Sequence, residues 1–131
     1  MTKNKFDIVF IFLLCIFCFL LFYSFKQIGF SNDELSAYNR CQYNGFNELI
    51  EKGVIPDGHP AGVQVFLFYY IKYISDTDWV IKLPFVFFAI LSFVLLYLIA
   101  VKLYNKKVAY LSLIFFIFSA FILSHSTTAR P

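Results

Sequence analysis

The stretch IVFIFLLCIFCFLLFYSF, residues 8–25, decides the fold because it is eighteen residues long and carries no charge. A helix needs about 20 predominantly apolar residues to cross the hydrocarbon core of a bilayer, so this stretch predicts a membrane span. A cleaved signal peptide would need a shorter apolar core and a small-x-small cleavage site, and residues 31–34 (SNDE) offer no such site. Lys3 and Lys5 precede the stretch. We therefore expect an uncleaved anchor whose N-terminus is cytoplasmic.

The composition of the 131-residue chain points the same way. Hydrophobic residues make up 60% of it, aromatic residues 22% and charged residues only 15%. A soluble domain is about 45–50% apolar and about 25% charged, so a water-soluble globule is excluded. The net charge of +3 comes from scattered Lys and Arg, so nucleic acid is not an expected partner. The predicted spans make membrane lipids expected partners. Cys15 and Cys18 lie inside the first apolar run, where they are expected to be small apolar residues, not a redox or metal pair.

Two further apolar runs predict two more spans. The run Leu83–Val101 is uncharged and has Pro84 near its start, a position that the first turn of a helix tolerates. It predicts a span over residues 83–103. Residues 108–124 are also uncharged and predict the third span. Lys102, Lys106 and Lys107 lie between the two runs, and the positive-inside rule places that turn in the cytoplasm.

Residues 60–75 are apolar but short, and two placements are open for them. Only about twelve residues separate Pro60 from Lys72, and a helix of that length falls well short of the roughly 30 Å hydrocarbon core. If the segment crossed the membrane, the lysine-bearing turn at 102–107 would lie outside, against the charge rule. We therefore expect an interfacial helix, with a crossing helix as the alternative.

Residues 26–82 are then one extracytoplasmic loop, which holds seven of the eight acidic residues. Its first helix is expected to begin at the caps Ser31 and Asn32 and to stop at Gly53, and its second to follow His59-Pro60. The predicted fold is an all-α membrane protein. It has three transmembrane helices and one extracytoplasmic loop with two juxtamembrane or interfacial helices.

The polar residues of this loop allow both structural and chemical interpretations. Asp33 and Glu34 lie at the start of a predicted helix. They are either two carboxylates that the positive end of the helix dipole stabilises, or one of them is a general base at the membrane surface. His59 is either a turn residue or part of an anion site at a helix start. Arg130, after the third run, either snorkels to the interface or binds phosphate. Lys72 and Lys82 are interpreted as interfacial anchors.

The order of several short motifs resembles the N-terminal part of polytopic membrane glycosyltransferases of family 39 type, relatives of the protein O-mannosyltransferases and of the lipid A aminoarabinose transferase. In that group an Asp-Glu pair follows the first span, and a His-Pro motif follows a Gly-containing loop. A Leu-Pro pair opens a later span, and many bacterial members carry Ala-Arg-Pro-Tyr after the span that follows it. This chain has the corresponding residues Asp33-Glu34, Asp57-Gly58-His59-Pro60, Leu83-Pro84 and Ala129-Arg130-Pro131. The resemblance runs from about Phe6 to Pro131.

The resemblance implies roles for four residues. Asp33 would be the catalytic carboxylate that faces the acceptor, and Glu34 its companion, which orients the loop or an associated ion. His59 and Arg130 would lie at the donor phosphate. Relatives often have His-Pro-Pro-Leu, whereas here Ala61 and Gly62 follow the His-Pro pair.

The implied reaction transfers a sugar from a polyprenyl-phosphate donor to an extracytoplasmic glycan, lipid or protein, with inversion. No cofactor is certain, and a divalent metal ion is optional. Residues 1–131 would be the N-terminal part of such an enzyme in a bacterial inner or plasma membrane, inactive as an isolated fragment. The alternatives are a non-catalytic small membrane subunit or remnant, which binds a lipid or a protein, and a transporter fragment. Transporters usually carry ionisable groups within their spans, whereas these runs are uncharged.

Overall fold

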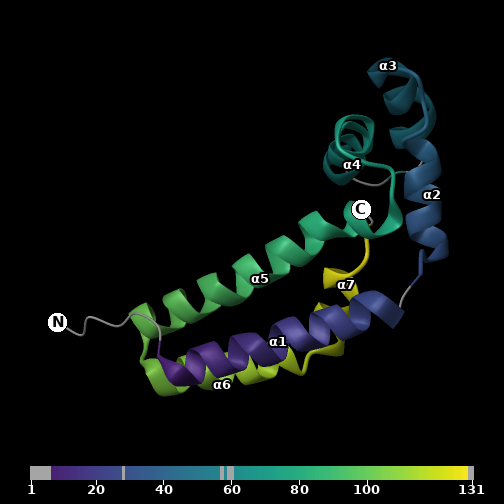
Figure 1. Ribbon diagram of the computed structural model, residues 1–131. Coiled ribbons are helices and arrows are strands. Elements are labelled where there is room, and N and C mark those ends of the chain that lie inside the picture. The colour runs from purple at the N-terminus through teal and green to yellow at the C-terminus, as the bar shows by residue number, and fades with distance from the viewer. Residues whose placement is uncertain (1–6, 28, 57, 59–60, 130–131) are drawn as a thin grey trace. The chain divides into compact units, whose positions relative to one another are not determined.

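The computed structural model describes residues 7–27, 29–56, 58 and 61–129, and their regular secondary structure is entirely helical. The helices are α1 (Ile8–Gln27), α2 (Asn32–Arg40), α3 (Phe46–Glu48), the π-helix η1 (Leu49–Val54), α4 (Ala61–Tyr73), α5 (Asp78–Leu103), α6 (Lys106–Ile117) and α7 (Ala120–Ser126) (Figure 1). The predicted all-α class is confirmed for these residues.

The chain divides into two compact units. The first contains α1, α5 from Phe85 onward, α6 and α7. The second contains α2, α3, η1, α4, the beginning of α5 and the residues that follow Thr127. The candidate residues Asp33 and Glu34 belong to the second unit.

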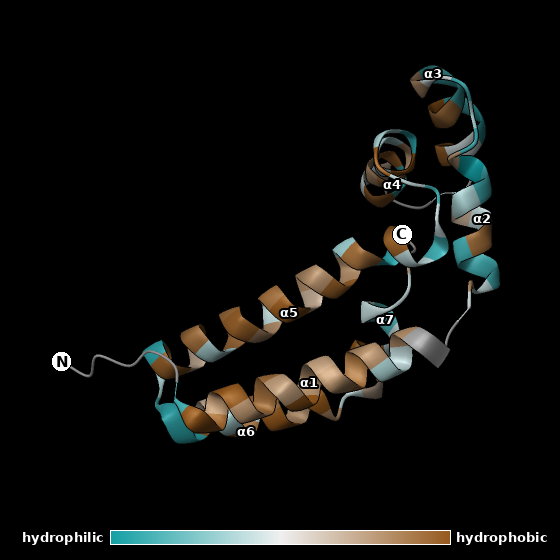
Figure 2. Ribbon diagram, viewed as in Figure 1, coloured by the Kyte–Doolittle hydropathy of each residue, from teal (hydrophilic) through white to brown (hydrophobic). Residues whose placement is uncertain are grey.

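Two helices in the described part of the chain are long and apolar enough to cross a membrane. They are α1, over Ile8–Phe25, and α5, over Asp78–Leu103. Figure 2 shows hydrophobic residues along nearly the whole length of both helices, whereas α2 is largely hydrophilic. A helix that is apolar on every side is typical of a membrane span or of a deeply buried core. These two helices therefore indicate a membrane protein.

The first unit is held by one row of side chains from each of three helices. The rows lie on α1, α5 and α6, and they pack small alanines between large aromatic and aliphatic residues. Small residues let helix backbones approach closely, which is how helices associate in lipid. The core residues are Phe10, Leu13, Phe17, Leu21, Ala89, Phe93, Tyr97, Ala100, Ala109, Leu113 and Ile117.

Aromatic contacts fix the directions of α1 and α5 in this unit. The Phe17 ring stacks on Phe93, with centroids 4.9 Å apart, and Phe10, earlier in α1, lies 4.4 Å from Tyr97, later in α5. Because position increases along α1 as it decreases along α5, the two helices are antiparallel. Offset and tilted ring pairs of this kind add about 0.5–1.5 kcal/mol each beyond the area they bury.

A polar cluster closes one end of the first unit. Asp7 precedes α1, and its carboxylate accepts a hydrogen bond from the Phe10 amide at 3.1 Å. The same carboxylate accepts from Lys106 Nζ at 2.7 Å and from the Tyr110 hydroxyl. The Lys106 ammonium, the Tyr110 hydroxyl and the Phe10 amide together lower the pKa of Asp7 from 3.8 to about 2. The start of α1 and the turn between α5 and α6 therefore lie at the same end of this unit.

The third predicted span is bent, not straight. Residues 108–124 fall into α6 and α7, whose axes differ by 66°. The break lies at Phe118–Ser119, and the Ser119 hydroxyl accepts a hydrogen bond from the Ile122 amide, which caps α7. A serine side chain that bonds the backbone in this way competes with a continuous helix. The two helices form a third candidate span only when they are taken together.

The second predicted span begins earlier than the sequence indicated. α5 starts at Asp78, so Pro84 is inside the helix and does not open it. Proline has no amide hydrogen and cannot bond the carbonyl four residues before it, which here belongs to Val80. The Tyr70 hydroxyl of α4 donates to that carbonyl at 3.2 Å. This contact satisfies the Val80 oxygen and allows the helix to continue through Pro84.

The loop helices also differ from the prediction. The expected single helix from residue 31 to Gly53 is split into α2, α3 and η1. Gly45 is extended, with φ −142° and ψ 161°, and this conformation separates α2 from α3. The helix predicted to follow His59-Pro60 is present as α4, thirteen residues long, or about 20 Å at 1.5 Å per residue.

Asp7→Asn should lower the thermal stability of the chain in detergent micelles at pH 7. Asparagine keeps the helix cap, so the change removes the charge of the pair with Lys106. Because the folded pKa is lower than the ordinary value, the ion pair stabilises fully above about pH 4 and is lost as the pH falls through about 2. The difference in melting temperature should therefore shrink between pH 4 and pH 2. Equal melting temperatures at pH 7 would contradict this role.

Candidate functional site

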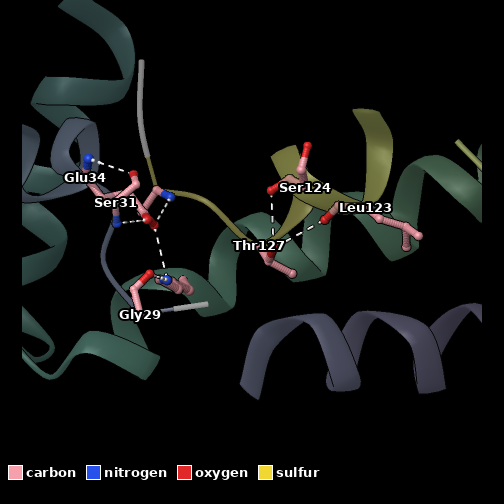
Figure 3. Close-up of polar contacts among 8 residues, drawn as sticks. Gly29, Ser31, Glu34, Leu123, Ser124 and Thr127 are labelled. Carbon is pink, nitrogen blue, oxygen red and sulfur yellow. Dashed lines mark hydrogen bonds and ion pairs between the residues drawn. The ribbon is translucent and has the colours of Figure 1, made fainter. Parts of the chain in front are cut away.

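The acid pair is positioned by the start of α2. Ser31 caps this helix: its hydroxyl accepts from the Glu34 amide at 3.3 Å, and the Ser31 amide donates to Glu34 Oε2 at 2.9 Å. Figure 3 shows these reciprocal bonds between Ser31 and Glu34. This capping box satisfies two amides that the first turn would otherwise leave unpaired. The predicted helix start at Ser31 and Asn32 is confirmed.

Glu34 is buried, with 1% of its surface exposed, and it is paired with Lys82. Lys82 Nζ lies 3.4 Å from Glu34 Oε1 and donates a hydrogen bond to the Gly29 carbonyl at 3.1 Å. The ammonium also lies 5.3 Å from the centre of the Phe30 ring, within reach of a cation–π interaction. A buried carboxylate is tolerated only when it is paired and hydrogen-bonded. Lys82 supplies that pairing charge.

The same carboxylate joins a distant part of the chain to α2. The Ala129 amide donates to Glu34 Oε1 at 2.7 Å, across 95 positions of sequence. Both residues belong to the second unit. Glu34 therefore connects the segment after α1, the beginning of α5 and the segment after α7. The residue after Ala129 is Arg130, one of the two predicted phosphate ligands.

Asp33 has a different environment from that of its neighbour. Its side chain is exposed, whereas Glu34 is buried in the same helical turn. A general base must reach the proton it accepts, and only an exposed carboxylate can meet an acceptor from the aqueous phase. The adjacent acids are thus divided: Glu34 holds the local structure and Asp33 faces outward.

The two other predicted site residues, His59 and Arg130, lie outside the described residues. Gly58, before His59, has φ +70°, a left-handed conformation that glycine adopts without strain. Within the described ranges, no three His, Cys, Asp or Glu side chains could together hold a metal ion.

Sequence reasoning missed the role of Lys82. It was interpreted as an interfacial anchor, like Lys72, but it is buried, with 3% of its surface exposed. Lys82 directly precedes a long apolar run and follows a segment rich in acidic residues. That combination is a signal that could have suggested a buried ion pair. The choice of Glu34 as its partner depends on tertiary packing, because 48 positions separate the two residues.

Gln64 of α4 is a second residue that the sequence did not single out. Its Nε2 donates to the Ala37 carbonyl at 2.9 Å and to the Cys41 sulfur at 3.2 Å. Ala37 and Cys41 lie one turn apart at the end of α2. The buried amide of Gln64 therefore fastens α4 to α2 and helps to hold the helix that carries Asp33.

Glu34→Gln and Lys82→Met should each lower the apparent free energy of unfolding by about 3–5 kcal/mol, because each leaves one buried charge without its partner. The double variant should be closer to the parent protein than either single variant. Thermal or denaturant unfolding in detergent micelles would measure all four proteins. Single variants within about 0.5 kcal/mol of the parent, as for ordinary surface substitutions, would contradict a buried ion pair.

Comparisons with family models, with curated proteins and with solved structures give no match for this chain.

Proposed function

We propose that residues 1–131 are the N-terminal part of a membrane glycosyltransferase of family 39 type, which transfers a sugar from a polyprenyl-phosphate donor to an extracytoplasmic acceptor. The observation that carries this proposal is the divided acid pair in the first turn of α2, a few residues after the candidate span α1. Glu34 is buried and fully engaged, whereas Asp33 is exposed. An exposed carboxylate that follows a candidate span by a few residues, in a helical turn held by its buried neighbour, is suited to act as the base of this reaction.

The proposed reaction is a displacement at the anomeric carbon of the donor sugar. The acceptor oxygen attacks that carbon, and its proton passes to Asp33. The bond between the anomeric carbon and the phosphate oxygen breaks, so the polyprenyl phosphate leaves and the configuration inverts. Cationic groups stabilise the charge that develops on the leaving phosphate, and His59 and Arg130 are assigned this role from the motif resemblance. Glu34 and Lys82 position the turn that carries Asp33.

The proposed topology has three spans, with α6 and α7 together as the third. The N-terminus lies in the cytoplasm and residues 26–82 lie outside. Two features of the first unit support it: α1 and α5 are antiparallel, and Asp7 bonds Lys106 at 2.7 Å. Both place the start of α1 and the lysine-bearing turn at one end, as the positive-inside rule requires. Residues 28–77 then begin and end on the same side, so α4, at about 20 Å, does not cross alone.

Cysteine labelling should test this topology. In a background without Cys15, Cys18 and Cys41, cysteines placed at the exposed positions Glu51 and Asp76 should react with a membrane-impermeant thiol reagent added outside intact cells. A cysteine placed at Asn105 should react only after the membrane is permeabilised. Labelling of the Asp76 position only after permeabilisation would mean that α4 crosses, and the three-span topology would be wrong.

Asp33→Asn should abolish most of the sugar transfer by the complete enzyme. The amide keeps the size and polarity of the side chain but cannot accept the proton, and general-base catalysis contributes about 10²–10⁴-fold. Transfer from a polyprenyl-phosphate donor should therefore fall by about that factor, while the amount of protein in the membrane stays near normal.

Asp76→Asn is the matched control for this prediction. Asp76 is also an exposed aspartate of the same loop, and its substitution should change transfer little. Near-normal transfer by Asp33→Asn, or equal losses in the two variants, would show that Asp33 is not the base.

A further inference from the structure

α4 has two faces of opposite character. Gln64, Leu67 and Phe68 are buried, and they hold α4 in the second unit. Phe66, Tyr69 and Tyr73 are 41%, 41% and 74% exposed. At about 100° of rotation per residue, these two sets lie about 180° apart around the helix. The face directed away from the rest of the unit is therefore aromatic, whereas a helix face in water is usually charged or polar.

Phe46 of α3 extends this exposed face. Its ring stacks with that of Tyr69, with centroids 6.3 Å apart and planes 18° from parallel, and Tyr69 stacks with Tyr73 at 6.1 Å and 4°. Phe46 is itself 44% exposed. We call the four residues Phe46, Phe66, Tyr69 and Tyr73 the aromatic face. It comes from two helices, so it is not a feature of the α4 sequence alone.

We propose that the aromatic face docks on the phospholipid interface of the membrane that α5 enters. This inference rests on the proposed topology, in which α5 is a span. Tyr73 lies five positions before Asp78, the first residue of that candidate span, and Trp79 in its first turn is 56% exposed. A segment so close to the start of a span must lie near the membrane surface.

The residue types identify the lipid interface as the occupant. Tyrosine and tryptophan concentrate at the boundary between hydrocarbon and water, because their rings are apolar and their polar tips reach water. Lys72 is exposed, and its Nζ lies 5.5 Å from the centre of the Phe68 ring. A long basic side chain at this position can extend to lipid phosphates while its stem stays on apolar surface.

Docking through this face would set the position of the acid pair. α2 packs on the opposite side of α4, where the Gln64 amide bonds the Ala37 carbonyl at 2.9 Å. With the aromatic face on the lipid, α2 and Asp33 lie on the aqueous side of α4. That placement separates the base from the hydrocarbon and keeps it at a constant distance from the membrane surface.

Tryptophan fluorescence of the full chain in vesicles tests this proposal. Trp79 is the only tryptophan, so Trp79→Phe gives a silent background into which Tyr69→Trp introduces one probe. Asn39→Trp, at an exposed position of α2, is the matched control. Each protein is reconstituted in phosphatidylcholine vesicles with and without bromine atoms near the headgroup end of the acyl chains.

The Tyr69→Trp probe should emit at shorter wavelength than the Asn39→Trp probe and lose most of its emission in brominated vesicles. The Asn39→Trp probe should keep its emission there and be quenched by iodide added outside. Access of iodide to the Tyr69→Trp probe without bromine quenching would overturn the proposal. Protection from both quenchers would also overturn it, because protein, such as a second copy of the chain, would then cover the face.

The fluorescence result can reject membrane docking without rejecting the proposed topology or the proposed sugar transfer. Labelling of the Asp76 position from outside, together with an unquenched Tyr69→Trp probe, would reject docking while the topology stands. Sugar transfer is not measured in the fluorescence experiment, so a loss or failure of transfer does not alter its result.

Discussion

The second unit depends on one buried carboxylate. Glu34 accepts hydrogen bonds from the amides of Ser31 and Ala129 and lies 3.4 Å from Lys82 Nζ. A carboxylate that is removed from water must find such partners, because an unpaired buried charge costs several kcal/mol. The requirement brings together segments from the beginning, the middle and the end of the chain. It also fixes the first turn of α2, and through that turn the position of Asp33.

This arrangement gives the two adjacent acids different environments. Glu34 has both of its oxygens engaged, so it acts on structure, and the helix cap and the ion pair are its contribution. Asp33 follows the same backbone into solvent, where a carboxylate can exchange protons. The proposed displacement reaction would need a base that is accessible and held in place, and the two neighbours differ in these two properties.

The first unit is organised by a different constraint. Backbone polar groups in hydrocarbon must be satisfied within each helix, so the chain there is helical, and its specificity comes from packing and from its polar end. Phe17 on Phe93 and Phe10 on Tyr97 set the antiparallel directions of α1 and α5. Asp7 with Lys106 joins the start of α1 to the start of α6 at one end of the unit.

The sequence by itself determined the helical class and the location of the apolar helices. Uncharged runs of this length leave few alternatives in a bilayer, and α1, α4 and the start of α2 at the Ser31 cap agree with the prediction. Local sequence signals were less reliable where a residue distant in sequence supplies a hydrogen bond that the local pattern lacks. Pro84 predicted a helix start, but the Tyr70 hydroxyl satisfies the Val80 carbonyl and lets α5 begin at Asp78.

Only the tertiary structure decided which acid is buried and what neutralises it. Asp33 and Glu34 have the same charge and adjacent positions, and the Ser31-x-x-Glu34 spacing permits a capping box but does not tell that Glu34 is buried. The capping box turns Glu34 inward, and the folded chain then supplies Lys82 and the Ala129 amide from 48 and 95 positions away. Contacts across such separations have no local sequence signal, because they form only when the helices pack.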